Sequence, residues 1–373
     1  MNITPTAGTT ASSELSDNSS KNRLLKHVWR KKIIPCFAHT LNLVVTQSID
    51  KSTEVSALIT KVRDIVKFIK RSVNASDQLR QKQIDIGAST SNTKKMILDV
   101  RTRWNSCFYM LERFVQLAPI LSEVLLTRPE APSMVNASEL NKIKELIELL
   151  KCFEIVNREI SADTYVTISK VIPLVSCLTE ALTKISAQDA IVGELKSELQ
   201  KNMNKRFDKL EFNSVLALAT VLDLRFKLLH FKDALANKKK TVLYLNSCIK
   251  DANNSVSTSE SSDEFATENP FDIWSHHKQL AHQNMKCKFS NSSAITTTAV
   301  ASINQNPTEM WDYMKNVFPE LYKQASKYLS IVATSVPSER LFSKAGATIT
   351  KQRNRLTGKR LSKLLFLNSV LNK

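Results

Sequence analysis

The sequence predicts a mainly α-helical fold, on two grounds: its composition and the spacing of its apolar residues. The chain of 373 residues has only 5 Gly and 10 Pro, the residues that interrupt helices, while apolar residues make up 42%. In several long stretches the apolar residues recur every three or four positions, as on one face of an amphipathic helix. A chain of this length has room for two or three domains.

The clearest helical patterns lie in the first half of the chain. Residues 49–80 predict one or two amphipathic helices, and a polar connector follows at 81–93. Residues 144–160 are strongly amphipathic, and residues 164–182 predict a further helix with Pro173 near a kink or turn. The apolar stripe of the first stretch consists of Val55, Leu58, Ile59, Val62, Ile65, Val66 and Ile69.

Cysteine and histidine usage predicts no metal site. The 6 Cys are far apart and form no Cys-x-x-Cys pair, so reduced, buried thiols are expected in place of a zinc finger. His276, His277 and His282 suggest a metal, but no set of Cys or carboxylates completes the site. A solvated helix face is therefore the preferred interpretation of these histidines.

The net charge of +18 indicates attraction to polyanions, among which nucleic acid is favoured. The alternative is a basic, solvated helical surface. No apolar run reaches the about 18 residues of a membrane-spanning helix, so no membrane partner is expected.

The most informative stretch is Tyr328 to Gly346. Its apolar start predicts a strand or extended segment that begins at Tyr328, and a turn and a helix opening at about Pro337 follow, because proline suits the first helical turn. Glu339 would lie in that first turn, where a carboxylate suits the positive end of the helix dipole. Leu341 and Phe342 would lie on the buried side of the same helix.

Residues 338–343, Ser-Glu-Arg-Leu-Phe-Ser, resemble a block in the C-terminal dimerisation region of hAT-superfamily DNA transposases and of the host proteins derived from them, often called BED-finger proteins. The resemblance implies an RNase H-like fold in which Glu339 is the last of three metal-holding carboxylates. It also implies an incomplete RNase H-like α/β core, with remnants near 33–36, 95–104 and 330–350, interrupted by a large all-α insertion.

Two further blocks of the family are matched near the N-terminus. Asp17 and Asn18 resemble the start of its Asp-Asn-x-x-x-Asn sequence, which makes Asp17 a vestigial second catalytic carboxylate. Cys36 and His39 resemble its Cys-x-x-His block, which helps to shape the active site. From the residues alone, a packed Cys and a hydrogen-bonded His are favoured over half of a metal site.

Asp99 to Ser106 resembles the family's Asp-x-x-Thr-Arg-Trp-Asn-Ser block. The resemblance implies that Arg103 and Trp104 contact DNA, and an arginine beside a flat aromatic ring suits a phosphate and a base. A core tryptophan is the equally weighted alternative. Asp223 and Arg225 belong to another family block and are interpreted as a structural pair.

The last helix, expected at Leu361 to Leu371, is apolar on nearly every side and must be buried against its own chain or a partner. The resemblance assigns it to a dimer, and an isologous two-fold dimer is expected. The dimerisation residues expected from these stretches are Leu341, Phe342, Leu361, Leu364, Leu365 and Leu367.

These patterns divide the chain into six parts. They are a disordered N-terminus at 1–16, a partial RNase H-like segment at 17–109, an all-α insertion at 110–254, a polar linker at 255–266, the end of the insertion at 267–327, and the dimerisation region at 328–373.

The functional prediction is a truncated, transposase-derived protein, located in the nucleus, that is not an enzyme. It would act through a homodimer or a heterodimer with related proteins, with DNA as a further candidate partner. The family's first catalytic carboxylate is expected to be missing, so no cofactor is predicted, and Mg²⁺ or Mn²⁺ would matter only if the chain were catalytically competent. The alternative is a residual metal-dependent transposase or nuclease module.

Overall fold

The computed structural model describes residues 35–161, 167–232, 272–286, 300–335 and 357–371. The chain divides into two units, 1–35 and 36–373, and of the first unit only Pro35 is among the described residues. The helices named in the following paragraphs all belong to the second unit. Three predicted parts lie outside the described residues: the N-terminus at 1–16, the start of the RNase H-like segment at 17–34, and the polar linker at 255–266.

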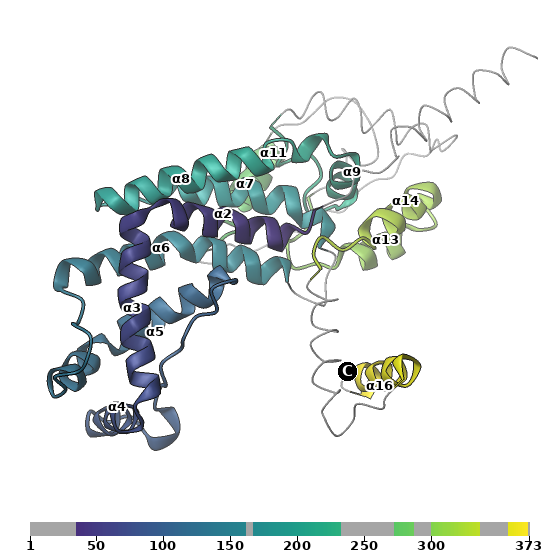
Figure 1. Ribbon diagram of the computed structural model, residues 1–373. Coiled ribbons are helices and arrows are strands. Elements are labelled where there is room, and N and C mark those ends of the chain that lie inside the picture. Colours follow the sequence, from purple (N-terminus) through teal and green to yellow (C-terminus); the bar gives the residue numbers. More distant parts are fainter. Residues whose placement is uncertain (1–34, 162–166, 233–271, 287–299, 336–356, 372–373) are drawn as a thin grey trace, which may run out of the picture. The chain divides into compact units, whose positions relative to one another are not determined.

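The described residues are mainly helical and contain no strand, which confirms the predicted class (Figure 1). Residues 95–100 and 331–335, where strand remnants were expected, form no regular element. The α-helices are α2 (Phe37–Lys51), α3 (Thr53–Arg71), α4 (Val73–Asp85), α5 (Trp104–Leu126), α6 (Ala137–Ile160), α7 (Val171–Lys184), α8 (Ala190–Phe207), α9 (Ser214–Leu222), α11 (Ser275–Lys286), α13 (Pro307–Met314), α14 (Pro319–Leu329) and α16 (Gly358–Leu371). Short 3-10 turns are η1 (Thr90–Asn92), η2 (Ile168–Lys170) and η3 (Leu210–Phe212).

Helix α3 buries the whole stripe that the sequence predicts, because its apolar residues return to one face every three or four positions. Helix α6 begins at a capping box, in which Asn136 and Glu139 each satisfy a backbone N–H of the other. The predicted amphipathic stretch 144–160 forms the rest of this helix.

Neighbouring helices form one core within this unit. Helix α2 packs against α8, α5 against α6, and α14 against α9. Phe37 and Phe207 join α2 to α8, with ring centroids 5.4 Å apart. In the same interface the amide of Asn202 donates to the hydroxyl of Ser48 at 2.9 Å, so the polar groups in this contact are satisfied.

One sequence expectation about a helix end is wrong. Tyr328 and Leu329, expected to begin a strand, form the last turn of α14, whose buried positions Leu321, Ala325, Tyr328 and Leu329 have helical spacing. Pro173, expected near a kink or turn, lies in the first turn of α7 directly after the 3-10 turn η2, where a missing N–H costs nothing. No helix among the described residues is long and apolar enough to span a membrane.

Candidate functional site

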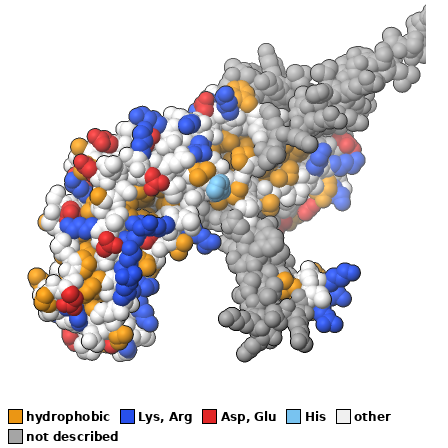
Figure 2. All heavy atoms as spheres, viewed as in Figure 1, with side chains coloured by type: hydrophobic (Ala, Val, Ile, Leu, Met, Phe, Trp, Pro, Cys, Tyr) orange, Lys and Arg blue, Asp and Glu red, His pale blue; other side chains and the backbone are white. Residues whose placement is uncertain are grey.

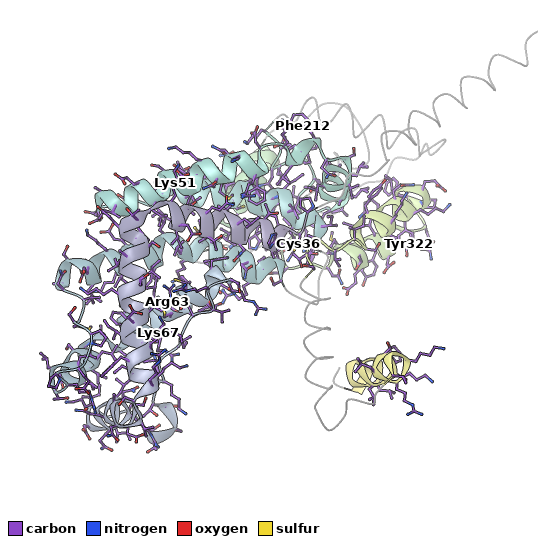
Figure 3. The ribbon with its side chains drawn as sticks, in the orientation of Figure 1. Cys36, Lys51, Arg63, Lys67, Phe212 and Tyr322 are labelled. Atoms are coloured by element: carbon purple, nitrogen blue, oxygen red, sulfur yellow. The ribbon has the colours of Figure 1, made fainter. Side chains whose placement is uncertain are left out.

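The Cys-x-x-His block meets the stretch that leads to Glu339. Cys36 precedes the first turn of α2 (Figure 3), and its sulfur accepts hydrogen bonds from the backbone N–H and the hydroxyl of Ser335, both at 3.3 Å. Next to it, the N–H of Phe37 donates to the carbonyl of Ala333 at 3.0 Å. The N–H of Ala333 in turn donates to the hydroxyl of Thr167 at 2.9 Å. Cys36 therefore helps to hold the backbone that enters the Ser-Glu-Arg block.

The other residues predicted for a catalytic site are not brought together in the described part of the chain. Asp17 and Glu339 lie outside the described residues, as do Leu341 and Phe342. His39 follows Cys36 by nearly one helical turn on α2, and its side chain is exposed. The catalytic role of the two carboxylates stays a prediction.

Trp104 belongs to the helical core. Its side chain is 4% exposed and meets the ring of Phe153 edge to face, at 6.2 Å and 78°. A base cannot stack on the indole in this position, so of the two interpretations offered by the sequence the structure favours the core tryptophan. Arg103, directly before it, is exposed and available to a ligand.

Asn42 connects the two motifs and was missed by the sequence analysis. Its carbonyl oxygen accepts a hydrogen bond from the N–H of Trp104 at 3.1 Å, and its amide lies 3.5 Å from the carbonyl of Thr102. The turn before α5 is thus fixed to the helix that begins at Cys36. The signal in the sequence is a polar residue within the apolar run Leu41 to Val45, where an amide needs a partner.

Asp99 is a structural residue of the same block. Its carboxylate binds the guanidinium of Arg63 in two places, Nε at 2.9 Å and Nη2 at 2.8 Å. This hydrogen-bonded pair raises the pKa of Arg63. Burial, with the Asp99 charge nearby, raises the pKa of the Cys107 thiol to about 12, so the thiol stays protonated.

The predicted structural pair of Asp223 and Arg225 is confirmed. The guanidinium binds the carboxylate through Nε at 2.9 Å and Nη2 at 2.7 Å, and both side chains are buried. Ser169 donates a further hydrogen bond to the carboxylate at 2.6 Å. The remaining donor of Arg225 lies 3.3 Å from the carbonyls of Ile303 and Gln305, so this pair holds the segment before α13.

The histidines expected on a solvated face are partly buried. His277 is 3% exposed, and its Nδ1 lies 2.9 Å from Nε2 of the buried His230. Phe226 and Trp274 pack against the pair. The expectation failed because α11 packs on α7 with this face inward. Among the described residues, no group of three or more His, Cys, Asp or Glu side chains could hold a metal ion.

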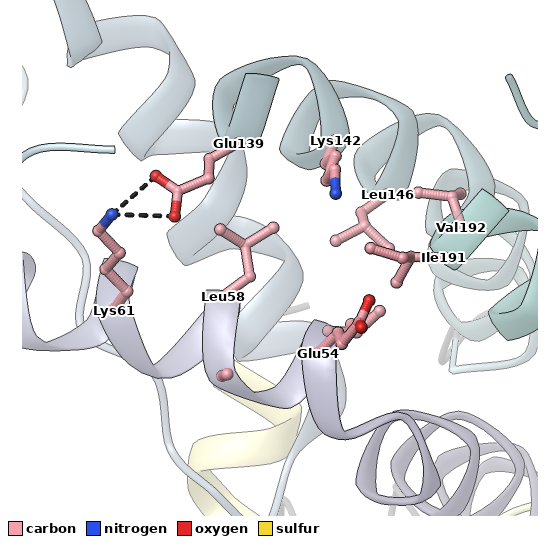
Figure 4. Close-up of a pocket in the computed structure, with 10 residues that line it drawn as sticks. Glu54, Leu58, Lys61, Glu139, Lys142, Leu146, Ile191 and Val192 are labelled. Atoms are coloured by element: carbon pink, nitrogen blue, oxygen red, sulfur yellow. Dashed lines mark hydrogen bonds and ion pairs between the residues drawn. The ribbon is translucent and has the colours of Figure 1, made fainter. Parts of the chain in front are cut away.

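A cavity of about 470 Å³ opens between the first turns of α3, α6 and α8 (Figure 4). Its floor is apolar, with Leu58 and Leu146 among its residues. Both lysines that line the cavity are paired with carboxylates: Lys61 binds both oxygens of Glu139, at 2.9 and 2.7 Å, and Lys142 lies 3.5 Å from Asp189. Because these lysines already bind carboxylates of the same chain, the cavity is interpreted as part of the contact between the three helices.

Two family models match the chain. Residues 34–149 match the ZBED1 RNase-like helical domain, and residues 292–371 match the hAT family C-terminal dimerisation region. Both matches confirm the resemblance found in the sequence motifs. The first covers α2 to α5 and the start of α6, and the second covers α13, α14 and α16.

Similar full-length proteins carry BED-finger names. The chain is 25% identical over 363 residues to the human zinc finger BED domain-containing protein 4, over 95% of this chain and 30% of that protein. It is 27% identical over 212 residues to the rice zinc finger BED domain-containing proteins RICESLEEPER 1 and RICESLEEPER 2, over 56% of this chain and 28% of each. The chain thus spans less than a third of the length of these relatives.

Proposed function

We propose that this chain, a member of the hAT transposase-related proteins, acts by dimerisation with itself or with related proteins and does not cut DNA on its own. The observation that carries the proposal is the match of residues 292–371 to the hAT C-terminal dimerisation region. A dimerisation region supplies an association function that needs no catalytic site.

The exposed apolar residues of α16 support this proposal. Leu364 is 38% exposed, Leu367 is 52% exposed and Leu361 is half-buried. Leu365 lies in the same helix, and its side chain is outside the described part of the structure. Leucines grouped on one short helix gain free energy when a partner covers them, about 25 cal/mol for each Å² of apolar surface buried.

Sedimentation of the full chain over a concentration series tests the proposal. We expect a dimer in the wild-type protein and at least a tenfold weaker dimer, about 1.4 kcal/mol, in Leu364→Lys/Leu367→Lys. The matched control is Val73→Lys/Leu126→Lys, which adds the same charge at apolar side chains that are 73% and 85% exposed elsewhere. A wild-type chain that stays monomeric, alone and after mixing with a full-length relative, would contradict the proposal.

A residual metal-dependent nuclease is the second candidate. It is supported by the contact between Cys36 and Ser335, because Glu339 follows Ser335 by only four positions. Two-metal cleavage needs several carboxylates that together bind two ions about 4 Å apart, and the matched motifs supply Asp17 and Glu339. Nicking that requires Mg²⁺ or Mn²⁺ and is lost in Glu339→Gln would establish this candidate in place of the first.

We also infer that the protein is located in the nucleus and contacts DNA. We further infer that the segments outside the helices have an RNase H-like origin. The net charge of +18 and the exposed Arg103 support the DNA contact. Residues 95–100 and 331–335 lie where the resemblance expects strands, and they have no regular structure of their own. A tagged full chain imaged in cells tests the location.

A further inference from the structure

Many lysines of the described surface bind carboxylates of other helices, but one region differs. Lys51 binds Glu198 at 2.8 Å, for example. In contrast, Lys95, Arg101 and Arg103 are exposed, and no described carboxylate lies within 4.0 Å of their charged nitrogens. Within the described part of the chain, no carboxylate neutralises these charges.

The first end of this region is fixed to α5. Residues 93–103 follow α4 and lead into α5. Lys94 Nζ donates to the side chain of Gln116 at 3.1 Å, and Arg113 Nη1 donates to the carbonyl of Lys95 at 2.7 Å. The segment therefore lies beside α5, and Arg113 adds its charge to that of the segment.

Near the other end, the hydroxyl of Ser106 bonds both the N–H and the carbonyl of Val100, at 2.8 and 3.0 Å. Arg101 and Arg103 follow directly in the turn before α5. Ser106 and Gln116 are ten residues apart on the helix, which corresponds to about 15 Å at 1.5 Å per residue. That length equals roughly four base-pair steps of about 3.4 Å along the axis of duplex DNA.

Helix α3 borders the same segment. Arg63 binds Asp99, whose side chain is 2% exposed, so this carboxylate is already neutralised and offers no repulsion to an anion. Lys67 and Lys70 follow Arg63 at i+4 and i+7 and share its helix face. Figure 3 labels Arg63 and Lys67 on α3, and Figure 2 shows a column of Lys and Arg side chains over this part of the molecule.

We propose that this basic strip binds the sugar-phosphate backbone of duplex DNA without reading its sequence, and that Trp104 takes no direct part. The strip is defined as Lys67, Lys70, Lys94, Lys95, Arg101, Arg103 and Arg113. The inference rests on the proposed DNA contact and gives it a surface, and it is independent of dimerisation through α16.

Three features favour a phosphate backbone. Cations outside ion pairs, such as Arg101 and Arg103, meet phosphates without first breaking a pair, and arginine can bind a phosphate through two nitrogens. Lys67, in contrast, binds Asp64 at 3.0 Å and would exchange that exposed pair for a phosphate. Four of the seven cations lie on the segment 93–103, which is fixed at both ends, so little ordering is needed on binding. Val100, 54% exposed, is the large apolar side chain exposed within the segment, which gives a lipid surface little to insert.

The test compares two triple variants of the full chain that carry the same net charge. Lys95→Gln/Arg101→Gln/Arg103→Gln removes charges from the strip. Lys144→Gln/Lys205→Gln/Lys209→Gln removes charges at exposed lysines on α6, on α8 and after α8. Binding of a random-sequence DNA duplex of about 30 base pairs, roughly three helical turns, is measured at several salt concentrations.

We expect the strip variant to reduce the slope of log K against log salt by about 2.7 per chain, at 0.9 per phosphate contact, and the control variant to keep the wild-type slope. Equal losses in the two variants, tighter binding to anionic vesicles than to DNA, or no DNA binding by the wild type would overturn the inference. Sedimentation of the same samples keeps the outcomes apart, because a dimer that does not bind DNA contradicts this inference and leaves the dimerisation proposal standing.

Discussion

At the scale of single residues, the pair of Arg63 and Asp99 is expected to have a large effect on the stability of the fold. The Asp99 side chain is 2% exposed and relies on both nitrogens of one guanidinium. Removing one partner of such a pair leaves a buried charge without compensation. We therefore expect Arg63→Met to lower the free energy of unfolding by about 3 to 5 kcal/mol, measured by urea denaturation.

The control for this prediction is Lys323→Met, which breaks the ion pair of 2.7 Å between Lys323 and Glu320 on the surface of α14. An exposed pair of this kind contributes about 0 to 1 kcal/mol. The double variant Arg63→Met/Asp99→Leu removes both charges and should recover most of the loss, because no buried charge remains. Equal effects of Arg63→Met and Lys323→Met would show that the pair is unimportant.

Single residues were predicted best where a motif gave each one a partner nearby in the sequence. Asp223 and Arg225 are two positions apart, and their pairing could be inferred from the chain alone. The partner of Asn42 is Trp104, at a distance of 62 residues, and the partner of His277 is His230, at 47 residues. No local pattern specifies such pairs, because they depend on how the helices pack.

At the scale of elements, we expect the contact of α11 with the segment after α9 to depend on pH. Burial lowers the pKa of His230 to about 3 and that of His277 to about 4, from about 6.5 in an unfolded chain. The folded state thus holds both rings neutral, and their contribution to stability is complete above pH 6.5 and is lost as the pH falls toward 4. We expect a loss of about 2 kcal/mol per histidine between pH 7.5 and 5.

Urea denaturation at pH 7.5, 6 and 5 measures this dependence. His276, Asp223 and Arg225 are titratable or charged neighbours of the pair, and all remain in the variants. His277→Gln should remove about half of the dependence, because His230 remains, whereas His39→Gln, at an exposed histidine on α2, should not change it. An equally steep dependence in His277→Gln would show that other groups cause the loss.

Elements were predicted well where periodicity is long and failed at their ends. The seven stripe positions of α3 are all buried, because a helix of 19 residues repeats its pattern over several turns. Tyr328 and Leu329 could be assigned to a strand because a short apolar run has no period of its own. Their helical state follows from Leu321 and Ala325, which lie a turn or two earlier on α14.

At the scale of the whole described unit, sequence-distant segments close the core. Cys36 and Ser335 are 299 positions apart, and Thr167 and Ala333 are 166 apart. Contacts of such separation cannot be read from a single sequence without the family motifs, which identified both ends of the first contact. They also link the early helices to the end of α14, so the unit should unfold as one.

The reactivity of the buried thiols tests whether the described unit unfolds as one. Cys107, Cys152 and Cys177 lie in α5, α6 and α7, and burial raises the pKa of each to about 12, so none should react with iodoacetamide in the folded protein. Cys36 is half-buried and serves as the control that reacts before unfolding.

Peptide mass spectrometry across a urea series should show Cys107, Cys152 and Cys177 becoming modified at one common midpoint, because α5 packs on α6 and α6 on α7 in a continuous core. Separate midpoints would divide these helices into independent folding units. In that case the end of the match at 34–149, which falls within α6, would mark a boundary between folding units inside a pair of packed helices. The hydrogen bond from Ser335 to Cys36 would then connect two separate folding units.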